Sequence, residues 1–142
     1  MALDTTTEDR LKVLTQFGKN LVVEAGAGTG KTSSLIKRIG VAVLAQNKAV
    51  EKIVALTFTE KAAAEIKSRL ISAFHQTIQL IEKEQTHQTA APEDSLLKLL
   101  QDNFSLSNKD ILPRVQEALA HLDRAGVGTI HGFCADILRT FP

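Results

Sequence analysis

The chain has 142 residues, of which 44% are hydrophobic and 23% charged, and a mean hydropathy near zero. This composition excludes disordered, collagen-like and low-complexity chains, and at this length one hydrophobic core is expected. The net charge of +1 comes from 17 Lys and Arg against 16 Asp and Glu, so it does not by itself indicate a nucleic-acid or membrane partner.

The first third of the chain predicts a helix, a strand and a second helix. Residues 8–16 have the spacing of a short helix. The apolar run at 21–23 leads into glycines, which predicts a buried strand that ends in a loop. Apolar residues then recur at helical spacing over 35–43. Gly40 lies inside that helix and indicates a close neighbour, because glycine there costs about 1 kcal/mol relative to Ala.

The middle of the chain predicts another strand and a long helix. Residues 53–56 form a second apolar run typical of a buried strand. The spacing of Thr57 and Glu60 then fits a capping box, with the Thr as N-cap of the next helix. The expected apolar stripe of that helix consists of Ala63, Ile66, Leu70, Phe74, Ile78 and Ile81.

The remaining third predicts a loop, helices and a third strand. Polar residues at 86–94 indicate a loop, and helices are expected near 95–102 and 109–123. Residues 127–130 follow as a strand, and 131–139 as a helix. Strands that alternate with helices predict an α/β fold with a parallel sheet and flanking helices, in which ligands bind at the carboxyl ends of the strands.

One strand-to-helix turn carries a phosphate-binding pattern at 25–32, with Ala in place of the first Gly. Glycines allow backbone N–H groups to approach phosphate oxygens, and the following helix adds the positive end of its dipole. Lys31 can reach the β- and γ-phosphates, and the Thr32 hydroxyl can bind Mg²⁺. The glycine spacing excludes a dinucleotide-binding fingerprint, whereas a simple glycine-rich turn with a surface lysine remains the alternative.

Two further segments carry a resemblance to a family. Residues 56–66 resemble motif Ia of the UvrD/Rep superfamily 1 helicases, and residues 129–134 resemble their motif Ic. The opening at 23–32 is similar to the RecB and AddA helicase–nuclease branch. The resemblance implies a P-loop, RecA-like motor domain that uses ATP and Mg²⁺ to move on single-stranded DNA. Residues 1–142 would be the N-terminal part of its first motor domain, with a helical insertion at about 86–123.

The resemblance also assigns residues to the site. Lys31 and Thr32 would serve catalysis, and Arg10 stands where the family has an adenine-contacting glutamine. The nucleotide-binding set is Ala25, Gly26, Ala27, Gly28, Thr29, Gly30, Lys31, Thr32 and Arg10. The DNA-facing set is Thr57, Phe58, Thr59, Lys61, Thr129 and His131. Without that context, Phe58 would be assigned to the core and His131 to a local hydrogen bond.

Besides Arg10, the sequence departs from the family in two further places. Glu60 replaces an Asn often found in motif Ia, which puts an acid near the expected DNA path. An apolar strand that ends in Asp-Glu, needed to hold Mg²⁺ and position water for hydrolysis, is missing. Asp123 follows apolar residues, but their period is helical and Arg124 comes next. The sequence therefore predicts an incomplete motor domain that binds nucleotide with negligible turnover.

Cysteine and histidine usage adds little chemistry. Cys134 is the single cysteine, which fits a reducing compartment and a small buried apolar residue. The spacing of His131 and Cys134 supplies two ligands, too few for a structural zinc site.

The N-terminus has neither the basic nor the apolar region of a secretory signal, and no apolar run could span a membrane. A cytoplasmic protein is expected.

Two other functions remain open at this point. A small P-loop nucleotide kinase would explain the phosphate loop but not the segments at 56–66 and 129–134. A truncated, non-catalytic nucleotide-binding module is the non-enzymatic alternative. The resemblance also implies a companion nuclease or helicase subunit for the longer protein.

Overall fold

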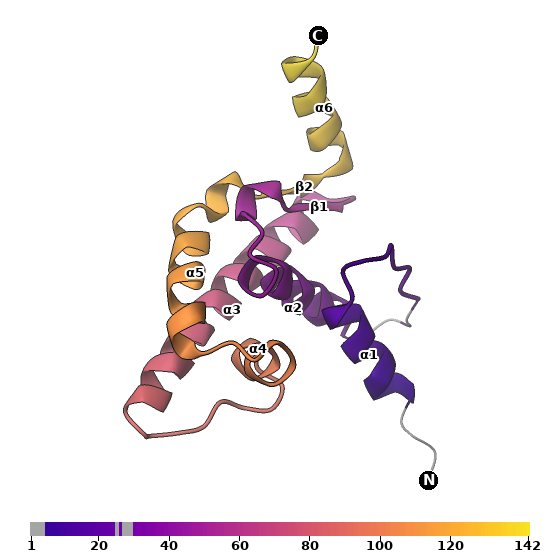
Figure 1. Ribbon diagram of the computed structural model, residues 1–142. Coiled ribbons are helices and arrows are strands. Elements are labelled where there is room, and N and C mark those ends of the chain that lie inside the picture. Colours follow the sequence, from indigo (N-terminus) through magenta and orange to yellow (C-terminus); the bar gives the residue numbers. More distant parts are fainter. Residues whose placement is uncertain (1–4, 25, 27–29) are drawn as a thin grey trace.

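Helices dominate the structure, a computed structural model that describes residues 5–24, 26 and 30–142 (Figure 1). The helices, in chain order, are α1 (Thr5–Thr15), α2 (Lys31–Leu44), α3 (Glu60–Gln85), α4 (Leu96–Phe104), α5 (Asn108–Ala120) and α6 (Ile130–Thr140). The strands are β1 (Val54–Thr57) and β2 (Gly126–Thr129), and short 3-10 turns occupy Val50–Lys52 and Leu122–Arg124.

The two strands form one small parallel sheet. Val54 pairs with Gly126, and Thr57 pairs with Thr129 at the other end. The connection between the strands contains α3, α4 and α5, as a parallel pair requires a long crossover. The predicted α/β class with a parallel sheet is therefore confirmed in its parallel pairing, although helices make up far more of the described chain than strands.

The core lies among helices rather than on both faces of a sheet. Helix α3 packs against α2, α4 and α5. The largest fully buried side chains there are Val41, Leu44, Leu70, Phe74, Ile81, Leu97, Leu100, Ile111 and Val115. Five of the six residues expected for the α3 stripe are buried, and Ile78 is half-buried.

Strand β1 is covered on one face. Ala55 is buried, whereas Val54 and Leu56 are 51% and 41% exposed. The prediction of a fully buried second strand is therefore wrong for the face that carries Val54 and Leu56. Their partners on β2, Gly126 and Gly128, contribute no side chains that could cover it.

The predicted first strand at 21–23 is also wrong. These residues are not in a strand, and Val22 is 89% exposed. An apolar run expresses a preference for burial, but it does not supply the neighbouring strand whose backbone groups must accept and donate the ladder hydrogen bonds. Among the described residues, β1 and β2 pair with each other and not with this segment.

Side-chain caps mark the starts of α5 and α3. The Ser107 hydroxyl accepts from the Asp110 backbone N–H, and the Asp110 carboxylate accepts from the Ser107 backbone N–H, which is a capping box at the start of α5. At α3, by contrast, the N-cap is Thr59, whose hydroxyl accepts from the Ala62 backbone N–H at 3.1 Å. The predicted capping box from Thr57 to Glu60 is therefore wrong, because Thr57 is still in β1.

Gly40 makes the close contact that its place in the helix indicated. A Cβ at Gly40 would lie 2.6 Å from Leu96 Cδ2 and 3.0 Å from Leu96 Cδ1. Both residues are buried. Gly40 therefore allows α4 to approach α2 closely, although glycine has a lower helix propensity than Ala.

A polar cluster ties the end of α3 to α4 and α5. One Glu84 carboxylate oxygen accepts from Gln101 Nε2 at 2.9 Å and from Asn108 Nδ2 at 2.8 Å, and the other accepts from the Ala91 backbone N–H at 3.3 Å. The hydrogen bond from Asn108 is the main reason that the pKa of Glu84 lies below its ordinary value. Partial burial acts in the opposite direction, and Gln101 and Ala91 add to the lowering.

We expect this cluster to make stability depend on pH in the acidic range. Because the folded-state pKa of Glu84 is lowered, its contribution is present at neutral pH and is lost as the pH falls below about 4.5 through the folded-state pKa. Glu84→Gln should lower the free energy of unfolding by about 1–3 kcal/mol at pH 7 and should flatten its fall in acid. Urea unfolding between pH 3 and 7 measures both, and Glu82→Gln, on the exposed side of α3, should change neither.

None of the described helices is both long enough and apolar enough to cross a bilayer.

Candidate functional site

The phosphate-loop end of α2 is the first part of the site. Gly30 is the N-cap of α2 and has a left-handed backbone, with φ of 84° and ψ of 25°. The first bond of the helix runs from the Ser34 N–H to the Gly30 carbonyl at 2.9 Å, and no side-chain hydrogen bond from the described residues caps this end. The N–H groups of the first turn therefore lack helical partners, and they carry the positive end of the dipole.

The side chains predicted for the nucleotide lie partly within the described chain. Lys31, the first residue of α2, and Gly26 are exposed, and Thr32 is half-buried. Ala25 and residues 27–29 lie outside the described residues. The positive φ at Gly30 explains why glycine stands at this position, since L side chains are strained there.

Helix α1, which carries Arg10, packs against α2. Arg38 of α2 donates from Nη1 to the Val13 carbonyl, and its guanidinium lies 4.4 Å from the centre of the Phe17 ring. Arg10 is exposed on α1. The structure thus fixes the helix of Arg10 beside the helix that begins at Lys31.

The second part of the site is formed where β1 and β2 end. The register places Thr57 opposite Thr129, so the segments at 56–66 and 129–134 leave the sheet side by side. The Thr57 hydroxyl donates to the Thr59 carbonyl at 2.9 Å. Phe58 is 88% exposed, which excludes the assignment of this ring to the core.

Both strands lead directly into helices that are capped by threonines. Thr59 caps α3, and Thr129 caps α6 by accepting from the Gly132 backbone N–H at 3.1 Å. The Thr129 hydroxyl also donates to Glu60 Oε1 at 3.2 Å. The sequence reasoning missed this bond, because it joins segments that become neighbours only through the parallel pairing.

The predicted DNA-facing residues therefore gather at one edge of the sheet. Phe58, Thr59 and Lys61 are exposed on the segment after β1, and His131 is exposed in the first turn of α6. Thr57 is half-buried, and Thr129 is buried at 7% exposure.

Cys134 departs from its prediction, because it is exposed on α6 rather than buried. Helix α6 extends away from the other helices (Figure 1) and buries none of its residues, so its apolar positions do not reach the core. Within the described chain, no group of three or more His, Cys, Asp or Glu side chains is arranged to hold a metal ion.

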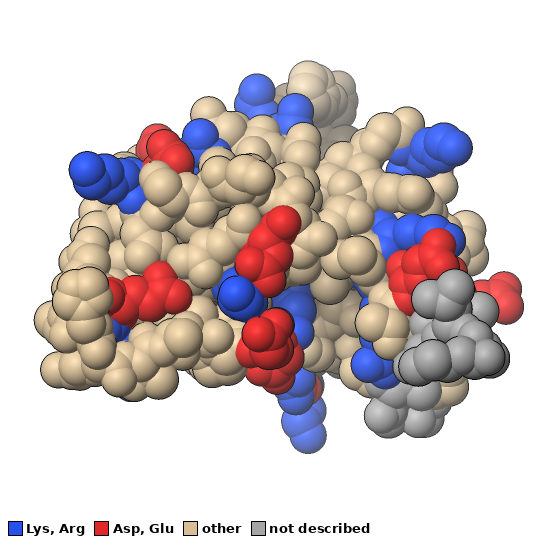
Figure 2. Space-filling view, turned by 60° about the horizontal axis from the view of Figure 1, so that its bottom comes forward, with Lys and Arg blue, Asp and Glu red and all other residues tan. Residues whose placement is uncertain are grey.

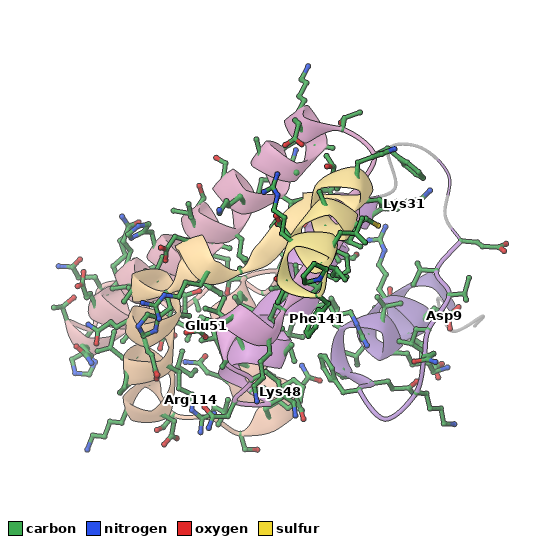
Figure 3. The ribbon with its side chains drawn as sticks, turned by 90° about the horizontal axis from the view of Figure 1, so that it is seen from above. Asp9, Lys31, Lys48, Glu51, Arg114 and Phe141 are labelled. Carbon is green, nitrogen blue, oxygen red and sulfur yellow. The ribbon has the colours of Figure 1, made fainter. Side chains whose placement is uncertain are left out.

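A cleft of about 190 Å³ lies at the opposite end of α2 from Lys31. Lys48, Glu51 and Arg114 line it (Figure 3). Two of its charged groups have protein partners, because Arg114 Nη1 donates to the Leu44 carbonyl at 2.7 Å and Glu51 pairs with His121 at 3.7 Å. The cleft is therefore separate from the start of α2, and Arg114 in its wall binds the C-terminal end of that helix.

The surface charge is mixed. On the face shown in Figure 2, Lys and Arg side chains lie among Asp and Glu side chains. Ion pairs such as Arg69–Glu65, at 2.7 Å, show the same mixing along a single helix. On this face the two signs of charge are therefore interspersed and do not form a wide basic field.

The chain is similar to known proteins along almost its whole length. Residues 6–142 match the model of the UvrD/REP helicase N-terminal domain family. The chain is 30% identical over 137 residues to an ATP-dependent helicase/nuclease subunit from Geobacillus thermodenitrificans, covering 95% of this chain and 9% of that protein. It is 33% identical over 121 residues to the ATP-dependent DNA helicase UvrD1 of Mycobacterium leprae, covering 76% of this chain and 14% of that protein.

The chain thus spans about a tenth of the length of the helicase/nuclease subunits that it matches, including a 30% identical relative from Bacillus licheniformis of which it covers 9%. The resemblance found from the three motifs is confirmed by the family match and by these relatives.

Proposed function

Because the chain belongs to the UvrD/REP helicase N-terminal domain family, we propose that it is the ATP-binding segment of a DNA helicase or translocase. In this proposal the triphosphate binds at the N-terminus of α2, within a RecA-like motor domain of which residues 1–142 are a part. Single-stranded DNA binds where β1 and β2 end. Thr32 would hold the Mg²⁺ that accompanies the nucleotide.

The start of α2 is the observation that carries the nucleotide part. A left-handed glycine, a first turn without a side-chain cap from the described residues and an exposed lysine occur together at one helix end. Each supports phosphate: the glycine leaves room for it, the N–H groups donate to it, and the ammonium group neutralises it. Arg10 is proposed to lie beside the base, because α1 packs on α2.

Turnover is a separate question from binding. Water attack on the γ-phosphate requires an acidic group that positions the water and holds the metal ion. The sequence of these 142 residues has no strand that ends in Asp-Glu. We therefore propose that this chain binds ATP with negligible hydrolysis, and that hydrolysis belongs to the longer parent protein.

The relatives indicate the wider setting of that protein. Several are named helicase/nuclease subunits, so a companion subunit and a role in DNA repair or recombination are proposed for the parent. A cytoplasmic location is proposed separately, because a single cysteine fits a reducing compartment. A nucleotide kinase would leave the exposed residues at the ends of β1 and β2 without a role.

Calorimetric titration with ATP and Mg²⁺ tests the nucleotide site. Lys31→Ala should weaken ATP binding by about tenfold or more, because a charge-assisted hydrogen bond contributes about 1.5–3 kcal/mol. Lys48→Ala is the matched control, since Lys48 is also exposed but follows the opposite end of α2 (Figure 3). Equal affinities for the wild type and both variants would contradict the proposed site.

A further inference from the structure

The hydrogen bond between Thr129 and Glu60 connects the two helices that leave the sheet. Thr129 Oγ1 donates to Glu60 Oε1 at 3.2 Å, and it accepts from the Gly132 N–H at 3.1 Å. Glu60 is the first residue of α3, and Gly132 lies in the first turn of α6. One hydroxyl therefore joins the beginning of α3 to the beginning of α6.

Thr129 is placed to act through these bonds rather than by contact with DNA. Its exposure is 7%, and a hydroxyl has a single proton to donate. While Glu60 accepts that proton, Thr129 has none to offer to a phosphate oxygen. Exposed predicted DNA-facing residues around it include Phe58 and Lys61 on one segment and His131 on the other.

Helix α6 contacts β1 and β2 but has no buried face. It buries no residue, and it extends away from the other helices (Figure 1). It is held by its chain connection, by its contacts with the two strands and by polar contacts at its first turn. The bond to Glu60 is a contact of this kind, and it reaches α6 through the residue that caps it.

We propose that Glu60 is a positioning residue for single-stranded DNA. Its carboxylate holds Thr129, and through Thr129 the first turn of α6, against the first turn of α3. Phe58 and Lys61 on one side and His131 on the other then form one fixed surface. This inference rests on the DNA part of the proposed function. In this role the Glu60 carboxylate accepts a hydrogen bond from Thr129, and its main effect is not the repulsion of DNA phosphate by its negative charge.

The sign of one substitution separates these two roles. If Glu60 mainly repels phosphate, removing its charge strengthens DNA binding. If Glu60 positions α6, losing the acceptor weakens DNA binding, whereas Glu60→Gln preserves it because the amide oxygen still accepts from Thr129.

The experiment is fluorescence anisotropy of a labelled oligodeoxythymidylate titrated with the 142-residue protein. Glu60→Ala should weaken binding by about threefold to tenfold, as expected for the loss of a hydrogen bond. Glu60→Gln should bind within about twofold of the wild type. The matched control is Glu65→Ala, an exposed acid on α3 that pairs with Arg69, and it should not weaken binding.

A double-mutant cycle tests positioning separately from stability. The effects of Phe58→Ala and His131→Ala should be non-additive in the wild type, because both side chains hold one strand on a fixed surface. They should become additive in the Glu60→Ala background. Thr129→Ser, which keeps both hydrogen bonds, should bind like the wild type.

The outcomes are distinct. Tighter or unchanged binding by Glu60→Ala, with the wild type binding DNA, overturns the positioning role and leaves the DNA site standing. A wild type that binds no oligonucleotide overturns the DNA part of the proposed function, and the role of Glu60 falls with it.

Discussion

Phe74→Ala should lower the free energy of unfolding by about 3–5 kcal/mol, the cost of truncating a fully buried aromatic ring. Phe74 has no exposed surface and lies near the middle of α3, the helix that packs against α2, α4 and α5. A small domain has only about 5–15 kcal/mol of net stability, so this single change would remove a large share of it.

The measurement is urea unfolding followed by far-ultraviolet circular dichroism, since the chain has no Trp or Tyr for fluorescence. Phe141→Ala is the matched control. That ring is 75% exposed just beyond α6, and its loss should change the free energy of unfolding by less than about 0.5 kcal/mol. A similar effect of both substitutions would show that the core does not centre on the buried face of α3.

Helices were predictable in this chain because their signals are local. The spacing of Ser107 and Asp110 marks the start of α5, and the apolar stripe through Phe74 defines the face that α3 buries. Each signal acts within a few residues and needs no distant partner.

Strands were less predictable because their partners are distant in sequence. The run at 21–23 has the apolar character of a strand, but its side chains are exposed and it is unpaired with β1 or β2. The predicted strand at 53–56 exists as β1, shifted by one residue to 54–57, but the sequence could not show that glycines would lie opposite Val54 and Leu56 on β2.

The candidate site also has one part that local signals predict and one part that depends on distant partners. The start of α2 at Lys31 was predictable, because a glycine followed by helical apolar spacing is a local pattern. The meeting of Glu60 with Thr129 was not, because it depends on the parallel register that sets Thr57 opposite Thr129. Resemblance to a family placed both segments near DNA, but it did not indicate this bond.

Phe58→Ala should weaken binding of single-stranded DNA by about 1–3 kcal/mol, which is roughly fivefold to 150-fold in the dissociation constant. Phe58 follows the end of β1 with 88% of its surface exposed, and an exposed ring without a packing role is suited to stacking on a base. The same substitution should leave the free energy of unfolding nearly unchanged, in contrast to Phe74→Ala.

Salt dependence distinguishes stacking from charge. Loss of a stacked ring should weaken binding equally at all salt concentrations, because the uncharged ring neutralises no phosphate and so releases no counterion from the DNA. Lys61→Ala, on the same exposed segment, should instead reduce the slope of log K against log salt by up to about 0.7. Phe141→Ala, another exposed ring, should affect neither quantity. Normal binding by Phe58→Ala beside a reduced slope for Lys61→Ala would mean that the edge of the sheet holds DNA by its phosphates alone.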